Sequence, residues 1–167
     1  MPISLYDVTI PVLVQGLRNL SAVLEKGCAF ADAQGLDHQT LLGARLAADM
    51  LPLTGQVQRA SDTAKGLAVR LGQVPNVAME DNETTFDALQ ARIAATIAFV
   101  EAVPREAIDG REEASIVLKL PSGDISFTGQ SYVLTFAIPN FFFHVTMAYA
   151  LLRQQGVPIG KRDYLGG

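Results

Sequence analysis

The stretch YVLTFAIPNFFFHVTMAYALLR, residues 132–153, is the most apolar segment of this 167-residue chain. It contains half of the aromatic residues and His144, one of only two histidines. Residues 132–152 carry no Asp, Glu, Lys or Arg, and this length could cross a membrane. Pro139 and Asn140 lie in its middle, however, and basic anchors are missing at its flanks apart from Arg153. We interpret it as a buried helix of a soluble bundle, kinked or divided at its proline.

Three other segments place apolar residues at steps of three and four, which is the spacing of an amphipathic helix. They cover about residues 11–34, 45–71 and 85–103. Asp37 can cap a short helical turn between the first two segments, and Pro52 marks an early turn or a kink of the second. Amphipathic helices need a common core, which favours a bundle over a single membrane span.

A β-hairpin is predicted between the third and fourth long helices. The segments SIVLKL at 115–120 and DISFT at 124–128 suit strands, and the residues PSGD between them suit a turn. A hairpin of this size is too small to stand alone, so we expect it over an end or side of the helices. The predicted fold is all-α: a four-helix bundle with a small inserted β-hairpin, in one domain over residues 1–167.

Composition excludes several classes of function. The net charge is −4 and the basic residues are scattered, so the electrostatic footprint of a nucleic-acid-binding protein is missing. Cys28 is the only cysteine, which excludes an internal disulfide, and we interpret it as a small core residue. The N-terminus lacks the basic and apolar regions of a signal peptide. We therefore expect a cytoplasmic protein that binds neither nucleic acid nor a membrane.

The candidate site combines residues from two predicted helices. Asn140 and His144 are four residues apart and share one face of the last helix. Asp49 and Gln56, seven residues apart, lie on nearly one side of the second helix. Bundles build metal sites from inward side chains on facing helices, with about three ligands of the His, Asp, Glu or Cys type. A hydrogen-bonded structural imidazole, a metal site, and a polar pocket without metal all remain open.

Other polar groups receive simpler interpretations. His38, the second histidine, has no partner at ligand spacing in the sequence. Glu80, Asp81 and Glu83 form a small acidic cluster in the loop before the third helix, and we interpret them as solvated charge. Calcium binding would need a longer pattern of ligands.

Four motifs are familiar: LLGARLAADMLPL at 41–53, ETTFDALQARI at 83–93, FTGQSYVLTFAIPNFFFHVTMAYALLR at 127–153 and the terminal GKRDYLGG. With them the chain resembles the DinB-like (YfiT-like) four-helix-bundle superfamily over essentially its full length. The branch it resembles is a bacterial domain of unknown function.

The resemblance implies a metal site that this sequence alters. Typical members of the superfamily use three histidines, one from the second helix and two from an HxxxH pair on the last. His144 matches the second histidine of the pair, Asn140 stands at the first, and the second-helix ligand falls near Asp49. Two of the three histidines are therefore replaced. Members of the superfamily are commonly dimers, so the resemblance also implies a homodimer.

Three hypotheses of function follow. The first is an uncharacterised DinB-like protein without the full metal site, with a small-molecule pocket around Asp49, Gln56, Asn140 and His144. The second is a thiol transferase or hydrolase that uses Zn, Ni or Mn held by His144, Asp49 and Asn140. The third is a stress-related interaction protein whose hairpin or C-terminal tail contacts a partner. The sequence leaves open whether the chain is an enzyme.

Overall fold

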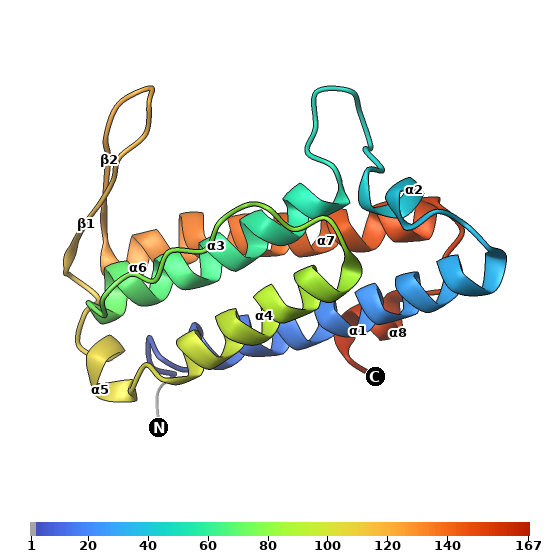
Figure 1. The fold of residues 1–167 in the computed structure, drawn as a ribbon. Helices are drawn as coiled ribbons and strands as arrows, with labels where there is room; N and C mark the ends of the chain where they lie inside the picture. The colour runs from blue at the N-terminus through green and yellow to red at the C-terminus, as the bar shows by residue number, and fades with distance from the viewer. Residues whose placement is uncertain (1–2) are drawn as a thin grey trace.

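Over residues 3–167, which the computed structural model describes, four long helices form the bundle (Figure 1). They are α1 (Ile10–Gln34), α3 (Leu53–Gly72), α4 (Phe86–Glu101) and α7 (Ile138–Gln154). α1 packs against α4 and α7, and α3 packs against the same two helices. Figure 1 shows that α3 and α4 run in the same direction, because the connection between them returns along the bundle. This is the bundle topology with a long crossover.

The first helix follows its sequence pattern closely. Its leucines at steps of three and four face the core, and Leu13, Leu17 and Leu24 are fully buried. The helix ends at Gly35, which adopts the left-handed conformation that glycine permits at a helix end. Gly16 lets α7 approach closely, since a Cβ at this position would lie 2.5 Å from the ring of Phe141. The contact between α1 and α7 therefore requires a residue without a side chain there.

The second long helix is shorter than predicted. Asp37 caps the short helix α2 (His38–Leu42), as expected, by accepting a hydrogen bond from the Gln39 amide. The chain then forms a non-helical connection over residues 43–52, and α3 begins only after Pro52. The prediction of a helix over residues 45–52 is wrong because Pro52 adopts extended backbone angles and precedes the first helical turn.

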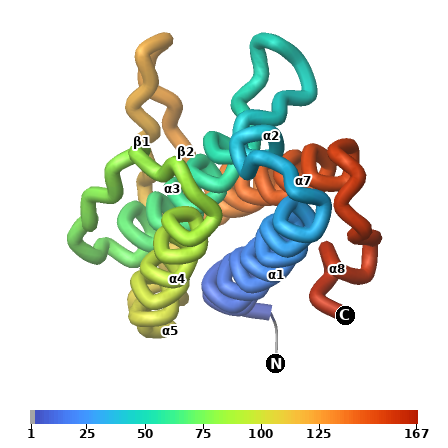
Figure 2. The backbone as a smooth tube through the Cα atoms, turned by 45° about the vertical axis from the view of Figure 1, so that its right-hand side comes forward, coloured from blue at the N-terminus to red at the C-terminus, as the bar shows by residue number. Residues whose placement is uncertain are grey.

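The predicted hairpin is present between α4 and α7. After the short helix α5 (Arg105–Ile108), strand β1 (Ser115–Leu118) pairs antiparallel with β2 (Ile125–Thr128), in the register that places Ser115 opposite Thr128. The hairpin projects from one end of the bundle, and the connection 43–52 projects from the same side near the other end (Figures 1 and 2). Both projections rise from the side formed by α3 and α7.

The last helix is continuous from Gly129 to Gln154, and its hydrogen-bond pattern changes before Pro139 without dividing it. Thr128 opens it with a capping box, and the chain passes through α6 (Gly129–Ser131) and the π-helix η1 (Tyr132–Ala137) into α7. Proline has no amide hydrogen, so the helical hydrogen-bond pattern changes in the turn that precedes it. Within the described chain, Gly129–Gln154 is the single stretch long and apolar enough to cross a membrane, by length and composition alone.

A C-terminal helix completes the structure. α8 (Lys161–Leu165) packs on α1, where the Asn19 side chain donates a hydrogen bond to the Tyr164 carbonyl oxygen at 3.0 Å. The Tyr164 ring meets Tyr149 edge-on, and its hydroxyl lies 3.0 Å from the Thr146 hydroxyl. The tail therefore belongs to the packed structure.

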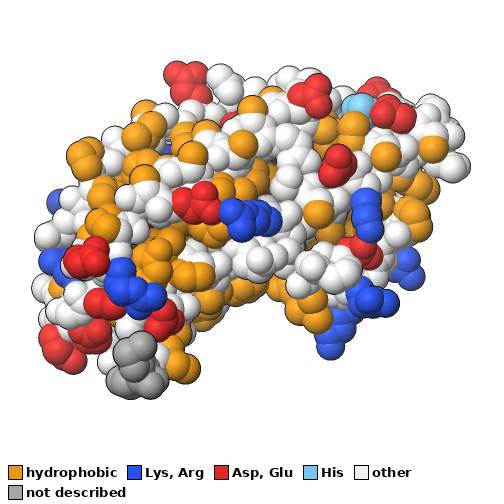
Figure 3. Space-filling model, turned by 90° about the horizontal axis from the view of Figure 1, so that it is seen from below, with side chains coloured by type: hydrophobic (Ala, Val, Ile, Leu, Met, Phe, Trp, Pro, Cys, Tyr) orange, Lys and Arg blue, Asp and Glu red, His pale blue; other side chains and the backbone are white. Residues whose placement is uncertain are grey.

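Charges of both signs are interspersed on the face that Figure 3 shows.

Candidate functional site

A chain of two hydrogen bonds fixes the imidazole of His144 between α3 and α7. The Gln56 amide nitrogen donates to the Leu51 carbonyl oxygen at 3.1 Å. The Gln56 Oε1 atom therefore faces His144 Nδ1, at 2.8 Å. Because an amide oxygen only accepts, Nδ1 carries the hydrogen and Nε2 keeps its lone pair. Gln56 is 1% exposed, so burial holds this arrangement in place.

The surroundings of His144 keep its ring neutral. Burial lowers the pKa of His144, and the positive charge of Arg59 lowers it further. Arg59 lies one helical turn after Gln56 on α3, and it forms ion pairs with Asp62 at 3.1 Å and Asp81 at 2.8 Å. At neutral pH the half-buried imidazole is thus an acceptor of hydrogen bonds and protons through Nε2.

Asn140 joins the same seam one turn earlier on α7. Its amide nitrogen donates to the Thr63 hydroxyl at 2.8 Å, and that hydroxyl donates to the Arg59 carbonyl oxygen at 2.7 Å. Gln56 and Thr63 are seven residues apart on α3, and they contact residues four apart on α7. We call Gln56, Thr63, Asn140 and His144 the α3–α7 polar seam. The structure thus brings together three of the four predicted site residues.

Asp49 lies outside α3. It is exposed in the connection 43–52, and the prediction that it shares a helical face with Gln56 is wrong because α3 starts four residues later. Sequence reasoning also missed Arg59 and Thr63. The seven-residue step from Gln56 to Thr63 could have identified the latter, since it matches two turns of a helix.

The seam does not fit the divalent metal that the superfamily implies. Zinc sites use about three His, Cys, Asp or Glu ligands, whereas the seam offers one imidazole nitrogen and amide or hydroxyl oxygens. The guanidinium of Arg59 also acts on His144, and this positive charge opposes a cation. Among residues 3–167, the groups of three such ligands do not include His144.

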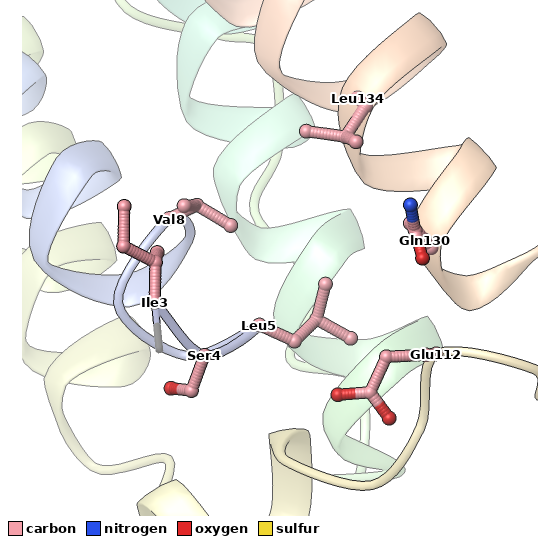
Figure 4. A pocket seen from close by; sticks show the side chains of 7 residues that line it. All are labelled: Ile3, Ser4, Leu5, Val8, Glu112, Gln130 and Leu134. Atoms are coloured by element: carbon pink, nitrogen blue, oxygen red, sulfur yellow. The ribbon is translucent and has the colours of Figure 1, made fainter. Parts of the chain in front are cut away.

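Cavities are found at other places on the surface. One of about 240 Å³ lies between the N-terminal segment and the last helix, lined by Leu5, Val8, Glu112, Gln130 and Leu134 among others (Figure 4). Figure 4 shows the Glu112 and Gln130 side chains facing apolar ones across it. It contains none of the predicted site residues. The seam is therefore not part of this cavity.

A family model described as a domain of unknown function, DUF1993, matches residues 5–165. The chain belongs to this family. The DUF1993 chain is also similar to the crystal structure of a DinB family member protein from Shewanella denitrificans, with 39% identity, a TM-score of 0.87 and coverage of 98% of this chain and 92% of that one. No curated protein matches it. The predicted DinB-like fold and relationship are confirmed.

A second polar cluster of the DUF1993 chain corrects the interpretation of the acidic loop. The Arg92 side chain on α4 is 2% exposed and forms ion pairs with Asp62 at 2.8 Å, Asp81 at 3.0 Å and Glu83 at 2.9 Å. It also donates to the Ser61 hydroxyl at 3.1 Å. The interpretation as solvated charge is therefore wrong for Glu83, which is 9% exposed and holds the crossover loop to the bundle, whereas Glu80 and Asp81 are exposed.

Proposed function

We propose that the DUF1993 chain binds a small molecule at the α3–α7 polar seam without the three-histidine metal centre. The hydrogen-bond chain from Leu51 through Gln56 to His144 supports this proposal. It fixes the ring nitrogen that carries the hydrogen, so Nε2 is left as an oriented acceptor. Among the described residues no side chain or backbone group occupies that lone pair.

The chemistry of the seam defines the class of ligand. Nε2 accepts from an O–H, N–H or S–H group, and a neutral imidazole can also take that group's proton. The Asn140 amide donates to Thr63 through its nitrogen, which leaves its oxygen as a second acceptor. The ligand is therefore a protic small molecule.

A nuclear magnetic resonance experiment on the imidazole nitrogens tests this proposal. In ¹⁵N-labelled protein we expect the neutral Nδ1–H tautomer of His144 and a pKa below the ordinary 6.5. A panel of small alcohols, amines and thiols is then added, and at least one class should shift the Nε2 resonance. The Gln56→Leu variant removes the acceptor for Nδ1, so it should populate both tautomers and weaken the response.

Metal analysis provides the opposing outcome. Wild-type protein and His144→Ala, both purified without chelator, are analysed for Zn, Ni and Mn. The proposal is overturned if the wild-type protein contains stoichiometric metal and the His144→Ala variant does not. That result would favour the metal-dependent transferase or hydrolase that uses His144, Asp49 and Asn140. An Nδ1 atom without hydrogen in the free protein would also contradict it.

We further propose that a second copy of the chain covers the α3–α7 side. Large exposed apolar side chains gather on the two projections and on the last helix. Only 33% of the residues in the most apolar part of that helix are buried. Leu46 and Leu51 lie on one projection and Val117 on the hairpin, while Phe143 is 51% exposed on α7. Phe143 directly precedes His144, so a homodimer through this face would shield the seam from water.

A further inference from the structure

A second group of metal-ligating side chains lies where α1 meets α2, away from the α3–α7 polar seam. Cys28 and Asp32 are on α1, and His38 is the first residue of α2. Their sulfur, oxygen and nitrogen ligand atoms all lie within 4.8 Å of one another. The prediction that His38 has no partner at ligand spacing is therefore wrong, because the chain folds back between the two helices.

Local structure explains why these three residues meet. Cys28 and Asp32 are four apart on α1, so they occupy one face a turn from each other. Gly35 ends α1 in the left-handed conformation at φ 63°, and Asp37 caps α2 two residues later. The His38 ring then reaches back, and its Nε2 lies 2.8 Å from Asp32 Oδ1.

Phe86 fixes the orientation of the histidine. Its ring meets the His38 ring edge-on, with 5.3 Å between the centroids. Phe86 is 2% exposed and begins α4, so the contact ties the imidazole to the core. A ring held by packing loses little conformational freedom when it binds a ligand.

We propose that Cys28, Asp32 and His38 form a binding site for a zinc-type divalent cation. A thiolate, an imidazole and a carboxylate are the three kinds of protein ligand that Zn²⁺ takes, and three of them leave one tetrahedral position for water. The sulfur ligand selects Zn²⁺ over Mg²⁺ and Ca²⁺, which prefer oxygen. The ligands also match the ion in charge, since the thiolate and the carboxylate together neutralise its two positive charges.

The charges around Cys28 favour a cation. The carboxylates of Asp32 and Asp87 both act on the Cys28 thiol, so negative charge surrounds the sulfur. Binding forms a metal–sulfur bond, breaks the S–H bond and releases one proton to the buffer. Glu25 and Asp87 line a cavity of about 260 Å³ beside Cys28, so additional negative charge lies next to the site.

Cobalt substitution tests the site, because Co²⁺ bound to a thiolate absorbs in the near ultraviolet. Purified full-length protein, kept reduced, is titrated with CoCl₂ and then with ZnCl₂. We expect a charge-transfer band at one equivalent of Co²⁺, which Zn²⁺ abolishes. Calorimetry in two buffers of different ionisation enthalpy should report the release of about one proton.

Variants decide which residues bind the metal. Cys28→Ser should remove the band, and His38→Ala should weaken Zn²⁺ binding by about 100-fold or more, since even supporting residues of metal sites contribute 10–100-fold. His144→Ala is the matched control and should retain the band. This result would distinguish the proposed site from the position at which the superfamily binds its metal. Zn²⁺ should also slow alkylation of the Cys28 thiol in wild-type protein. A wild-type titration without the band, or alkylation unaffected by Zn²⁺, would overturn the proposal.

Discussion

Replacing Arg92 by methionine should destabilise the bundle strongly, whereas the same change at Arg59 should not. Both arginines pair with Asp62 and Asp81, so the two variants remove the same kinds of contact. They differ in burial: the Arg92 side chain is 2% exposed and that of Arg59 is 46% exposed. Arg92 also pairs with the little-exposed Glu83, so the comparison measures the effect of a buried charge and its buried partner against that of an exposed charge.

The magnitude follows from the partners that would be left behind. In Arg92→Met the carboxylates of Asp62 and Asp81, each about one-third exposed, can turn to water. Glu83 is only 9% exposed and cannot, so it keeps an unpaired buried charge. Breaking such a buried pair costs about 3 kcal/mol, while an exposed pair such as those of Arg59 contributes less than about 1 kcal/mol. For a protein of this size, about 3 kcal/mol lowers the melting temperature by roughly 6–12 °C.

The free energy of unfolding, measured by urea denaturation from pH 7 to pH 3, checks this reasoning. Burial acts to raise the pKa of Glu83, but hydrogen bonds from Gln58 and Arg92 outweigh it and lower the pKa below 4.5. A carboxyl with a lowered folded-state pKa stabilises the fold above its unfolded-state pKa, and this contribution is lost as the pH falls through the folded-state value. The difference between wild type and Arg92→Met should therefore shrink at low pH. Equal losses in the two arginine variants would refute the argument.

Two further predictions concern surfaces. Deleting residues 161–167 should lower the free energy of unfolding by about 1–3 kcal/mol, because the deletion removes the packing of α8 and the ion pair between Lys26 and Asp163. An unchanged free energy of unfolding would instead favour a tail that binds a partner. Size-exclusion chromatography with light scattering should give a dimer for wild type and a monomer for Phe143→Glu, whereas Leu165→Glu, exposed outside the proposed interface, should stay dimeric. A wild-type protein that is monomeric in this measurement would contradict the proposed dimer.

Much of the fold could be predicted from local rules. The helices α1, α4 and α7 follow from apolar steps of three and four, and the cap at Asp37 follows from a side chain that accepts from a backbone amide. The hairpin follows from PSGD between two β-prone segments. Each of these signals is confined to a few neighbouring residues.

The parts that depend on distant contacts could not be predicted in this way. The prediction placed Asp49 on the second long helix because the apolar spacing continues through Pro52. In the structure the proline lies before the first helical residue. The acidic partners of Arg92 lie 9 to 30 residues away along the chain, and the crossover loop together with the packing of α3 on α4 brings them to it. The contact between Cys28 and His38 depends on the reversal at Gly35. Sequence spacing describes one helix at a time and carries no information on how the chain folds back.

The hairpin has a consequence for how this fold can vary in length. The chain leaves the bundle at Glu112 and returns at Gln130, and these two residues are joined by a backbone hydrogen bond of 2.8 Å. Gly129 passes so close to the Arg111 carbonyl oxygen that a Cβ would lie 2.0 Å from it. Residues 119–126 are all exposed, beyond the buried side chains of β1. The tip of the hairpin therefore lies outside the core. Extra residues can be inserted there without displacing the last helix.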